Sequence, residues 1–129
     1  MGTINSPQHH RLGRTGRAID KVREVIDKTV DGDNPEEGEL IVYGPNVVKG
    51  YHNKPEKTRA TMTEDGGLCT GDRAYVDADG YLHITGRIKE QFKLENGKFV
   101  SPATIEEEIK LLPCVEHTMI YGLTQIFKL

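Results

Sequence analysis

The four residues Asp77-Ala78-Asp79-Gly80 constrain the fold of this chain more than any other stretch. They separate two short runs with strand character, Arg73 to Asp77 and Tyr81 to Thr85. A turn that ends in Asp-Gly between two such runs indicates a β-hairpin, because glycine accepts the positive φ that other residues avoid. The sequence therefore predicts an antiparallel pair of strands at the centre of the chain.

Asp72 and Arg87 lie at the two open ends of this predicted hairpin. Because antiparallel pairing brings such ends together, we expect the carboxylate and the guanidinium to be neighbours. Gly71 lets a ligand approach the backbone closely, and the two charged groups suit a ligand with vicinal hydroxyls and a phosphate. A structural salt bridge that closes the hairpin explains the same spacing equally well.

The residues before the hairpin predict two strands and a helix. Residues 19–30 fit a helical face or one side of a strand, and their β-branched residues favour the strand. Leu40 to Tyr43 predicts a short strand, and Gly50 indicates a bulge or a close backbone approach. A helix is expected from about Pro55 to residue 62, with Asn53 as its N-cap.

The residues after the hairpin predict a second hairpin, a helix and a strand. The second hairpin pairs Phe92 to Leu94 with Lys98 to Val100 across a turn at Glu95-Asn96-Gly97. The helix begins at Ser101-Pro102 and ends at Pro113, and its apolar face carries Ile105, Ile109 and Leu112. Val115 to Tyr121 predicts a final strand.

Composition excludes several classes of function. The 129 residues suffice for one domain, or for one domain and part of another. The net charge of −3 comes without a basic stripe, so nucleic acid is not expected as a partner. No apolar run approaches the roughly 20 residues of a spanning helix, and none forms the core of a signal peptide. Cys69 and Cys114 have neither a metal-site nor a disulfide spacing, and His9-His10 lacks further ligands, so we expect free thiols and no metal.

Several motifs in register resemble the adenylate-forming acyl-CoA synthetase superfamily. They are Thr70-Gly71-Asp72, Asp79-Gly80-Tyr81, Gly86-Arg87-Ile88-Lys89-Glu90-Gln91, Lys93 and Asn96-Gly97-Lys98. An upstream block is similar to the same superfamily, in the same order: Gly38-Glu39-Leu40, Gly44-Pro45, Gly50-Tyr51 and Pro55-Glu56-Lys57-Thr58. The resemblance covers about Leu12 to Gly122, and the run from Phe92 to Lys98 is most similar to long-chain fatty acyl-CoA synthetases.

The resemblance implies an α+β fold in two parts. Residues 1–86 would form a small antiparallel barrel-like subdomain at the end of a large N-terminal lobe. Residues 87–129 would form the hinge and the beginning of an α+β C-terminal lobe. In the superfamily this lobe swings between a setting for adenylation and a setting for thioester formation. Tyr81 and Phe92 are expected in the core.

The resemblance also implies roles for five residues. Asp72 would accept hydrogen bonds from the ribose hydroxyls, and Arg87 would contact the ribose–phosphate region. Lys89 would be the hinge. Lys93 would act in the thioester step, and Gly97 would lie beside the path of the pantetheine arm. One extra residue separates Lys93 from Gly97 compared with many members, which leaves the reach of Lys93 open.

The function implied is that of an AMP-forming long-chain fatty acyl-CoA ligase. Its substrates would be a fatty acid, ATP with Mg²⁺, and coenzyme A. The phosphate loop, the adenine-binding segment and the late lysine of the superfamily are not found in these residues, so we expect an internal piece of a longer enzyme that is inactive alone. The expected location is intracellular, either cytoplasmic or peripherally attached to a membrane. Another adenylating enzyme, acting on an aryl or amino acid, and a non-catalytic binding or interaction module are the alternatives.

Overall fold

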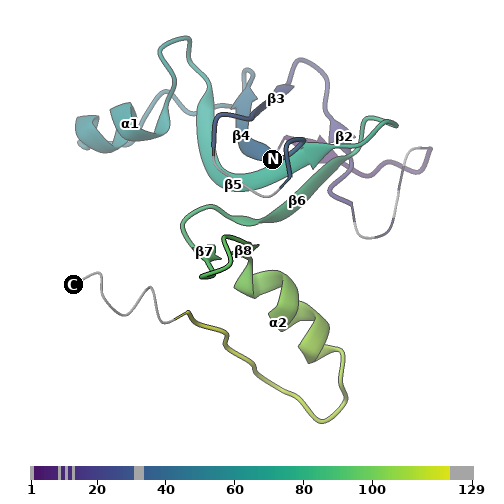
Figure 1. Ribbon diagram of the computed structural model, residues 1–129. Coiled ribbons are helices and arrows are strands. Elements are labelled where there is room, and N and C mark those ends of the chain that lie inside the picture. Colours follow the sequence, from purple (N-terminus) through teal and green to yellow (C-terminus); the bar gives the residue numbers. More distant parts are fainter. Residues whose placement is uncertain (1, 9, 11, 13, 31–33, 123–129) are drawn as a thin grey trace.

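The computed structural model describes residues 2–8, 10, 12, 14–30 and 34–122. Its main feature is an antiparallel sheet of four strands in the order β3 (Arg23–Asp27), β4 (Gly38–Tyr43), β5 (Leu68–Val76) and β6 (Leu82–Arg87). β5 is long and curved, and it crosses the middle of the molecule (Figure 1). In the described part of the chain the sheet is open, so the expected barrel-like subdomain is not a closed barrel.

The predicted central hairpin is confirmed as β5 and β6. The turn is fixed by the Asp77 carboxylate, whose Oδ1 accepts the N–H groups of Asp79 at 3.0 Å and Tyr81 at 2.9 Å. Gly80 has φ +80°, which is the conformation that the Asp-Gly sequence indicated. The ladder pairs Tyr75 with His83 and continues to the open end of the hairpin.

The core of the sheet is small. Leu40, Ala74 and Leu82 form its buried apolar cluster, and two partly buried side chains, Ile26 and Val42, pack against them. Tyr81 is 6% exposed, which confirms its predicted place in the core, whereas Phe92 is half-buried. A strand on each side of β5 therefore contributes to the same apolar cluster.

The strand prediction for residues 19–30 is confirmed by β3, and a helix precedes β5. α1 (Pro55–Thr61) has Lys54 as its N-cap, without a side-chain capping bond. The prediction that Asn53 caps this helix was wrong: Asn53 has φ +53°, in the left-handed region, and belongs to the turn before the cap. Gly50 does mark a close approach, because a Cβ there would lie 2.8 Å from the Cγ2 atom of Thr58.

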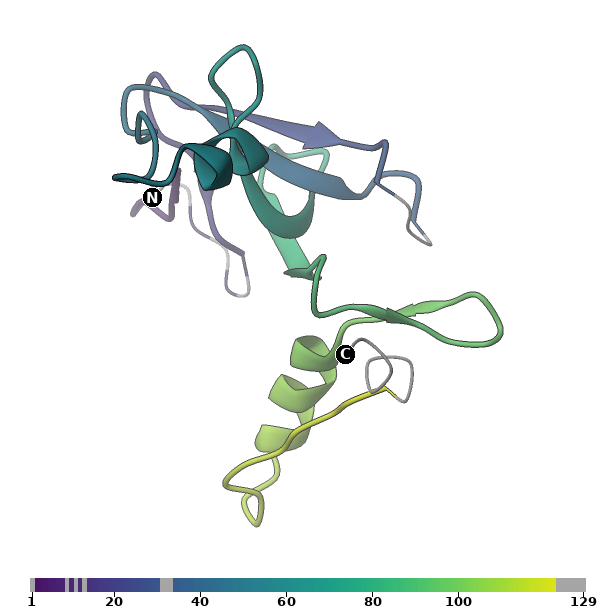
Figure 2. The ribbon, with the colours of Figure 1, turned by 90° about the vertical axis from the view of Figure 1, so that its left-hand side faces the viewer.

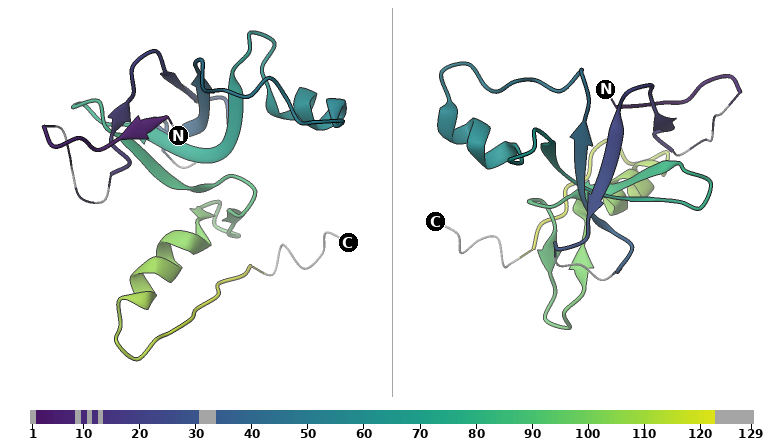
Figure 3. Two further views of the ribbon diagram at one scale, coloured as in Figure 1. Left: turned by 180° about the vertical axis from the view of Figure 1, so that it is seen from behind. Right: turned by 90° about the horizontal axis from the view of Figure 1, so that it is seen from above.

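A second group of elements follows β6. The second hairpin is confirmed as β7 (Phe92–Lys93) and β8 (Phe99–Val100), and the helix as α2 (Pro102–Lys110). α2 contacts β6, where the Thr104 hydroxyl donates to the Thr85 carbonyl at 3.3 Å. Figure 2 shows α2 below this hairpin, and α1 at the other end of the molecule. A short pair, β1 (Thr3–Ile4) with β2 (Arg17–Ala18), lies next to the sheet (Figure 3).

The predicted strand from Val115 to Tyr121 was wrong. These residues carry no ladder in the structure and run back along α2 as an extended segment (Figures 1 and 2). The Ile120 N–H ties this segment to α2 by donating to the Glu106 Oε1 at 2.6 Å. A helix uses its backbone groups internally, so it offers an extended neighbour no ladder. The mixture of antiparallel sheets and helices nevertheless confirms the α+β class.

Candidate functional site

The central hairpin brings Asp72 and Arg87 together as cross-strand neighbours. The Arg87 Nε lies 2.9 Å from the Asp72 Oδ1, and the two side chains are 59% and 21% exposed. An ion pair this exposed contributes little to stability, about 0–1 kcal/mol. Both groups are therefore accessible to a ligand while they form the salt bridge, and the sequence prediction that they would be neighbours is confirmed.

The stretch of β5 just before Asp72 is fixed by side-chain hydrogen bonds. The Thr70 hydroxyl donates to the Leu40 carbonyl at 2.9 Å, and the same oxygen accepts the Asp72 N–H at 3.1 Å. Gly71 lies between them with φ +74°, and nothing lies within 4 Å of the place where its Cβ would be. The Thr-Gly-Asp sequence thus presents a carboxylate from a backbone that a ligand can approach.

Glu39 also belongs to this region, although the sequence alone marked it only as part of the Gly38-Glu39-Leu40 motif. Its Oε1 accepts the Gly71 N–H at 3.1 Å. The neighbouring Glu37 accepts instead from the Thr85 hydroxyl, at 3.2 Å. Burial, followed by the charges of Glu39 and Asp27, raises the pKa of the Cys69 thiol. The signal that could have found Glu39 is its place in a strand that pairs with the strand carrying Thr70-Gly71-Asp72.

Lys89 lies in the turn of residues 88–90, between β6 and β7. The carbonyl of Arg87 holds this turn by accepting the N–H groups of Glu90 and Gln91, both at 3.1 Å. A cavity of about 260 Å³ adjoins it, lined by Lys89, Glu90, Pro102, Ala103, Glu106 and Ile120. Lys89 is thus placed where β6 connects to the second group of elements.

Lys93 and Gly97 belong to the hairpin of β7 and β8. The Lys93 ammonium lies 5.2 Å from the centre of the Phe99 ring, a cation–π distance, and the two residues are cross-strand neighbours. Gly97 has φ +88° and donates its N–H to the Leu94 carbonyl at 2.9 Å. Among the described residues, no hydrogen bond or ion pair joins Lys93 or Gly97 to the Asp72–Arg87 pair.

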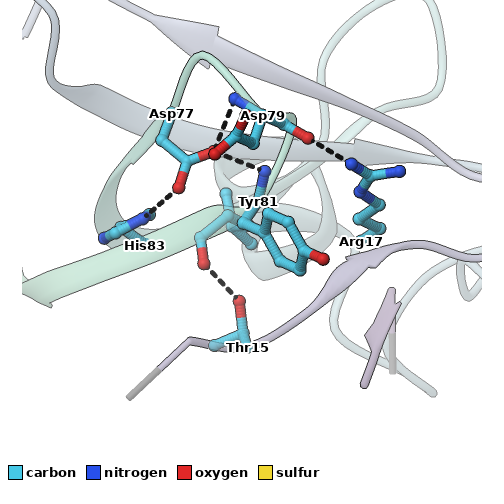
Figure 4. Close-up of polar contacts among 7 residues, drawn as sticks. Thr15, Arg17, Asp77, Asp79, Tyr81 and His83 are labelled. Carbon is cyan, nitrogen blue, oxygen red and sulfur yellow. Dashed lines mark hydrogen bonds and ion pairs between the residues drawn. The ribbon is translucent and has the colours of Figure 1, made fainter. Parts of the chain in front are cut away.

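A second polar cluster at the far end of the central hairpin was not predicted. His83 is 7% exposed, its Nε2 lies 2.9 Å from the Asp77 Oδ2, and its ring stacks on Tyr75 at 4.3 Å. The Tyr81 N–H and then His83 are the main causes that lower the pKa of the Asp77 carboxyl to about 2. Figure 4 shows the contacts of Asp77 with Asp79, Tyr81 and His83, which hold the turn together.

The described residues offer no assembled metal site: no group of three His, Cys, Asp or Glu side chains could hold an ion there. His9 of the sequence pair His9-His10 lies outside the described residues. Cys69 and Cys114 are both free thiols. Within the same residues, no helix has the length and apolar character needed to cross a bilayer.

Comparison with curated proteins identifies relatives along nearly the whole chain, although no family model matches it. A long-chain-fatty-acid–CoA ligase of Macaca fascicularis is 37% identical over 123 residues, which are 95% of this chain and 17% of the relative. An oxalate–CoA ligase of Arabidopsis thaliana is 35% identical over 114 residues, which are 88% of this chain and 22% of the relative. The chain thus spans less than a quarter of the length of these relatives.

Solved structures similar to this chain include one with a bound acyl-adenylate and one with bound ATP. O-succinylbenzoate coenzyme A synthetase from Bacillus subtilis, in complex with its acyl-adenylate intermediate, matches with a TM-score of 0.76 and 28% identity. The match covers 87% of this chain and 23% of that one. The ATP-bound chimera RpMatB–BxBclM matches with a TM-score of 0.69 and 36% identity, over 85% of this chain and 22% of that one.

Proposed function

We propose that this chain, which is homologous to one segment of the adenylate-forming acyl-CoA synthetases, belongs to a long-chain fatty acyl-CoA ligase. In that enzyme it would be the part that binds the sugar and phosphate of the nucleotide. The observation that carries the proposal is the partly exposed Asp72–Arg87 pair at the open end of the β5–β6 hairpin, where the Thr70 hydroxyl holds the Asp72 N–H. Asp72 would accept hydrogen bonds from the ribose hydroxyls. Arg87 would donate to the oxygens between ribose and phosphate.

The chemistry of such a ligase has two steps. The fatty acid carboxylate attacks the α-phosphorus of ATP and pyrophosphate leaves, which gives an acyl-adenylate. The thiolate of coenzyme A then attacks the acyl carbonyl, and AMP leaves. Asp72 and Arg87 would hold the same AMP moiety through both steps, so their contribution is orientation and charge complementarity. Mg²⁺ would enter with ATP, and we assign none of its ligands to this chain.

We place a boundary between residues 86 and 87 of this segment. In the proposal, residues 1–86 close the large lobe and residues 87–129 begin the mobile one, with Lys89 as the hinge. The turn of residues 88–90 that follows β6 supports this position. Lys93 and Gly97 would reach the site only in the thioester setting. Their placement on a separate hairpin supports that division.

The substrate class is inferred from the relatives. Several curated relatives at 37% and 38% identity are long-chain-fatty-acid–CoA ligases, which favours an acyl chain over an aryl or amino acid. The oxalate–CoA ligase, at 35% identity, makes a small dicarboxylate the second candidate. Substrate, cofactor use and thioester formation are proposed for the whole enzyme.

Binding of AMP to this chain tests the proposal. Because Asp72 and Arg87 hold one side of the nucleotide, we expect a millimolar dissociation constant, about −4 kcal/mol. Amide chemical-shift changes upon addition of AMP should centre on Gly71, Asp72 and Arg87. Asp72→Ala should abolish them.

Asp79→Asn is the control, since it removes a carboxylate from the opposite end of the same hairpin and should leave the shifts in place. Absence of shifts at Asp72, or equal loss in both variants, would contradict the proposed nucleotide site.

A further inference from the structure

The ladder between β4 and β5 is irregular where the Thr70–Gly71–Asp72 segment of β5 lies opposite β4. Its register shifts between Glu39 and Ile41. Such an irregularity leaves backbone groups without a ladder partner. Two side chains take the place of the ladder here: the Thr70 hydroxyl donates to the Leu40 carbonyl, and the Glu39 carboxylate accepts the Gly71 N–H.

Gly71 is consequently held at both of its backbone polar groups. Glu39 accepts its N–H at 3.1 Å, and the Ile88 N–H donates to its carbonyl at 3.0 Å. The second bond comes from the residue that follows Arg87, and Asp72 directly follows Gly71, so the neighbours of both charged residues are tied to this one glycine. The left-handed φ of +74° at Gly71 sets the direction in which the strand continues to Asp72.

We propose that Glu39 is a positioning residue for Asp72: its carboxylate fixes the Gly71 amide and thereby aims the Asp72 carboxylate at Arg87 and at the ligand. The functional half of this inference rests on the nucleotide site proposed above, whereas the structural half does not. Glu39 acts as a hydrogen-bond acceptor for the Gly71 N–H and makes no contact with the nucleotide.

Glu37 shows why the acceptor position matters more than the charge. It lies two residues before Glu39, and its carboxylate also reaches across the sheet. Glu37 accepts from the Thr85 hydroxyl and not from the Gly71 N–H. It therefore adds negative charge at the same end of the sheet without holding Gly71. The two glutamates therefore form a matched pair that separates charge from geometry.

The first measurement is hydrogen exchange of the Gly71 amide in the whole chain. Glu39→Ala should accelerate this exchange about tenfold, as expected for loss of a hydrogen bond to a charged acceptor. Glu39→Gln keeps an acceptor oxygen at the same reach and should stay within about twofold of the parent chain. Glu37→Ala should leave the Gly71 amide unchanged.

The second measurement is the AMP titration, which separates the two halves of the inference. Glu39→Ala should reduce the AMP-induced shifts at Asp72, and Glu39→Gln should restore them. If AMP fails to bind the parent chain, the nucleotide site is refuted while the exchange data still decide the role of Glu39. Unchanged Gly71 exchange in Glu39→Ala, or equal acceleration in Glu37→Ala, would overturn the proposal.

A third measurement covers the case in which Glu39→Ala does not fold. In the parent chain the Gly71 amide should exchange more slowly than a glycine amide in an unstructured peptide. An unprotected Gly71 amide would show that Glu39 does not hold it, and would overturn the proposal without any variant.

Discussion

Gly86 is the residue at which a single methyl group should loosen α2 from the sheet. It lies in β6 next to Arg87, with φ +147°, a conformation that costs an L-residue about 1–3 kcal/mol. A Cβ at Gly86 would overlap the Ser101 Oγ and would lie 3.1 Å from the Ser101 Cβ. Ser101 is the N-cap of α2, so the overlap falls where the helix joins the hairpin.

The total cost of Gly86→Ala follows from these two sources. Overpacking adds about 1–3 kcal/mol to the backbone strain, so we expect the free energy of unfolding to fall by about 2–5 kcal/mol. Ser101→Gly alone should cost a few tenths of a kcal/mol, because its side chain makes no capping bond. In the double variant the overlap disappears and the strain remains, so about 1–3 kcal/mol should be recovered.

Urea unfolding followed by far-UV circular dichroism measures all four corners of this cycle. Gly80→Ala is the control, since Gly80 also has a positive φ but nothing lies within 4 Å of its Cβ position. Its cost should be insensitive to Ser101→Gly. Additive effects of Gly86→Ala and Ser101→Gly would refute the reasoning, because they would show that Gly86 does not contact the start of α2.

Three further predictions concern the core, the hairpin turn and activity. Leu82→Ala should cost about 2–5 kcal/mol because Leu82 is 2% exposed, whereas Ile84→Ala on the same strand, at 46% exposure, should cost under about 1 kcal/mol in the same urea assay. The lowered pKa of Asp77 means that its ionised form stabilises the fold at pH values above the ordinary value of 3.8, and that this contribution is lost as the pH falls towards about 2. Asp77→Asn should remove that part of the pH dependence of the urea midpoint. An unaltered loss of stability at acidic pH in this variant would contradict the role of the carboxylate that contacts His83. The isolated chain should release no pyrophosphate from ATP, magnesium and fatty acids, and turnover that Asp72→Ala abolishes would show that the site is complete.

The features that sequence predicted well are local in the chain. The Asp-Gly turn defined the central hairpin, and hairpin register alone placed Asp72 beside Arg87. Proline after a polar residue likewise located the beginning of α2. Each of these signals acts within one hairpin or at one helix end, so no knowledge of the distant chain was needed.

The features that sequence missed depend on partners far away in the chain. Glu39 reaches Gly71 across 32 positions, through an irregular ladder that no residue pattern announces. The segment from Val115 to Tyr121 has strand-forming residues, but a strand also requires a neighbour with free backbone groups. Asn53 is a common capping residue that here occupies a left-handed turn instead.

The outer strand β3 has a consequence for the behaviour of the chain in solution. In the described part of the structure it pairs on one side only, with β4, so its other side presents backbone groups that another copy could extend. Three of its five residues are charged, Arg23, Glu24 and Asp27, and such charges oppose edge-to-edge association. Burial raises the pKa of Glu24, so mild acid neutralises this carboxylate before an ordinary one. Resistance to aggregation through this edge should therefore weaken as the solution becomes acidic.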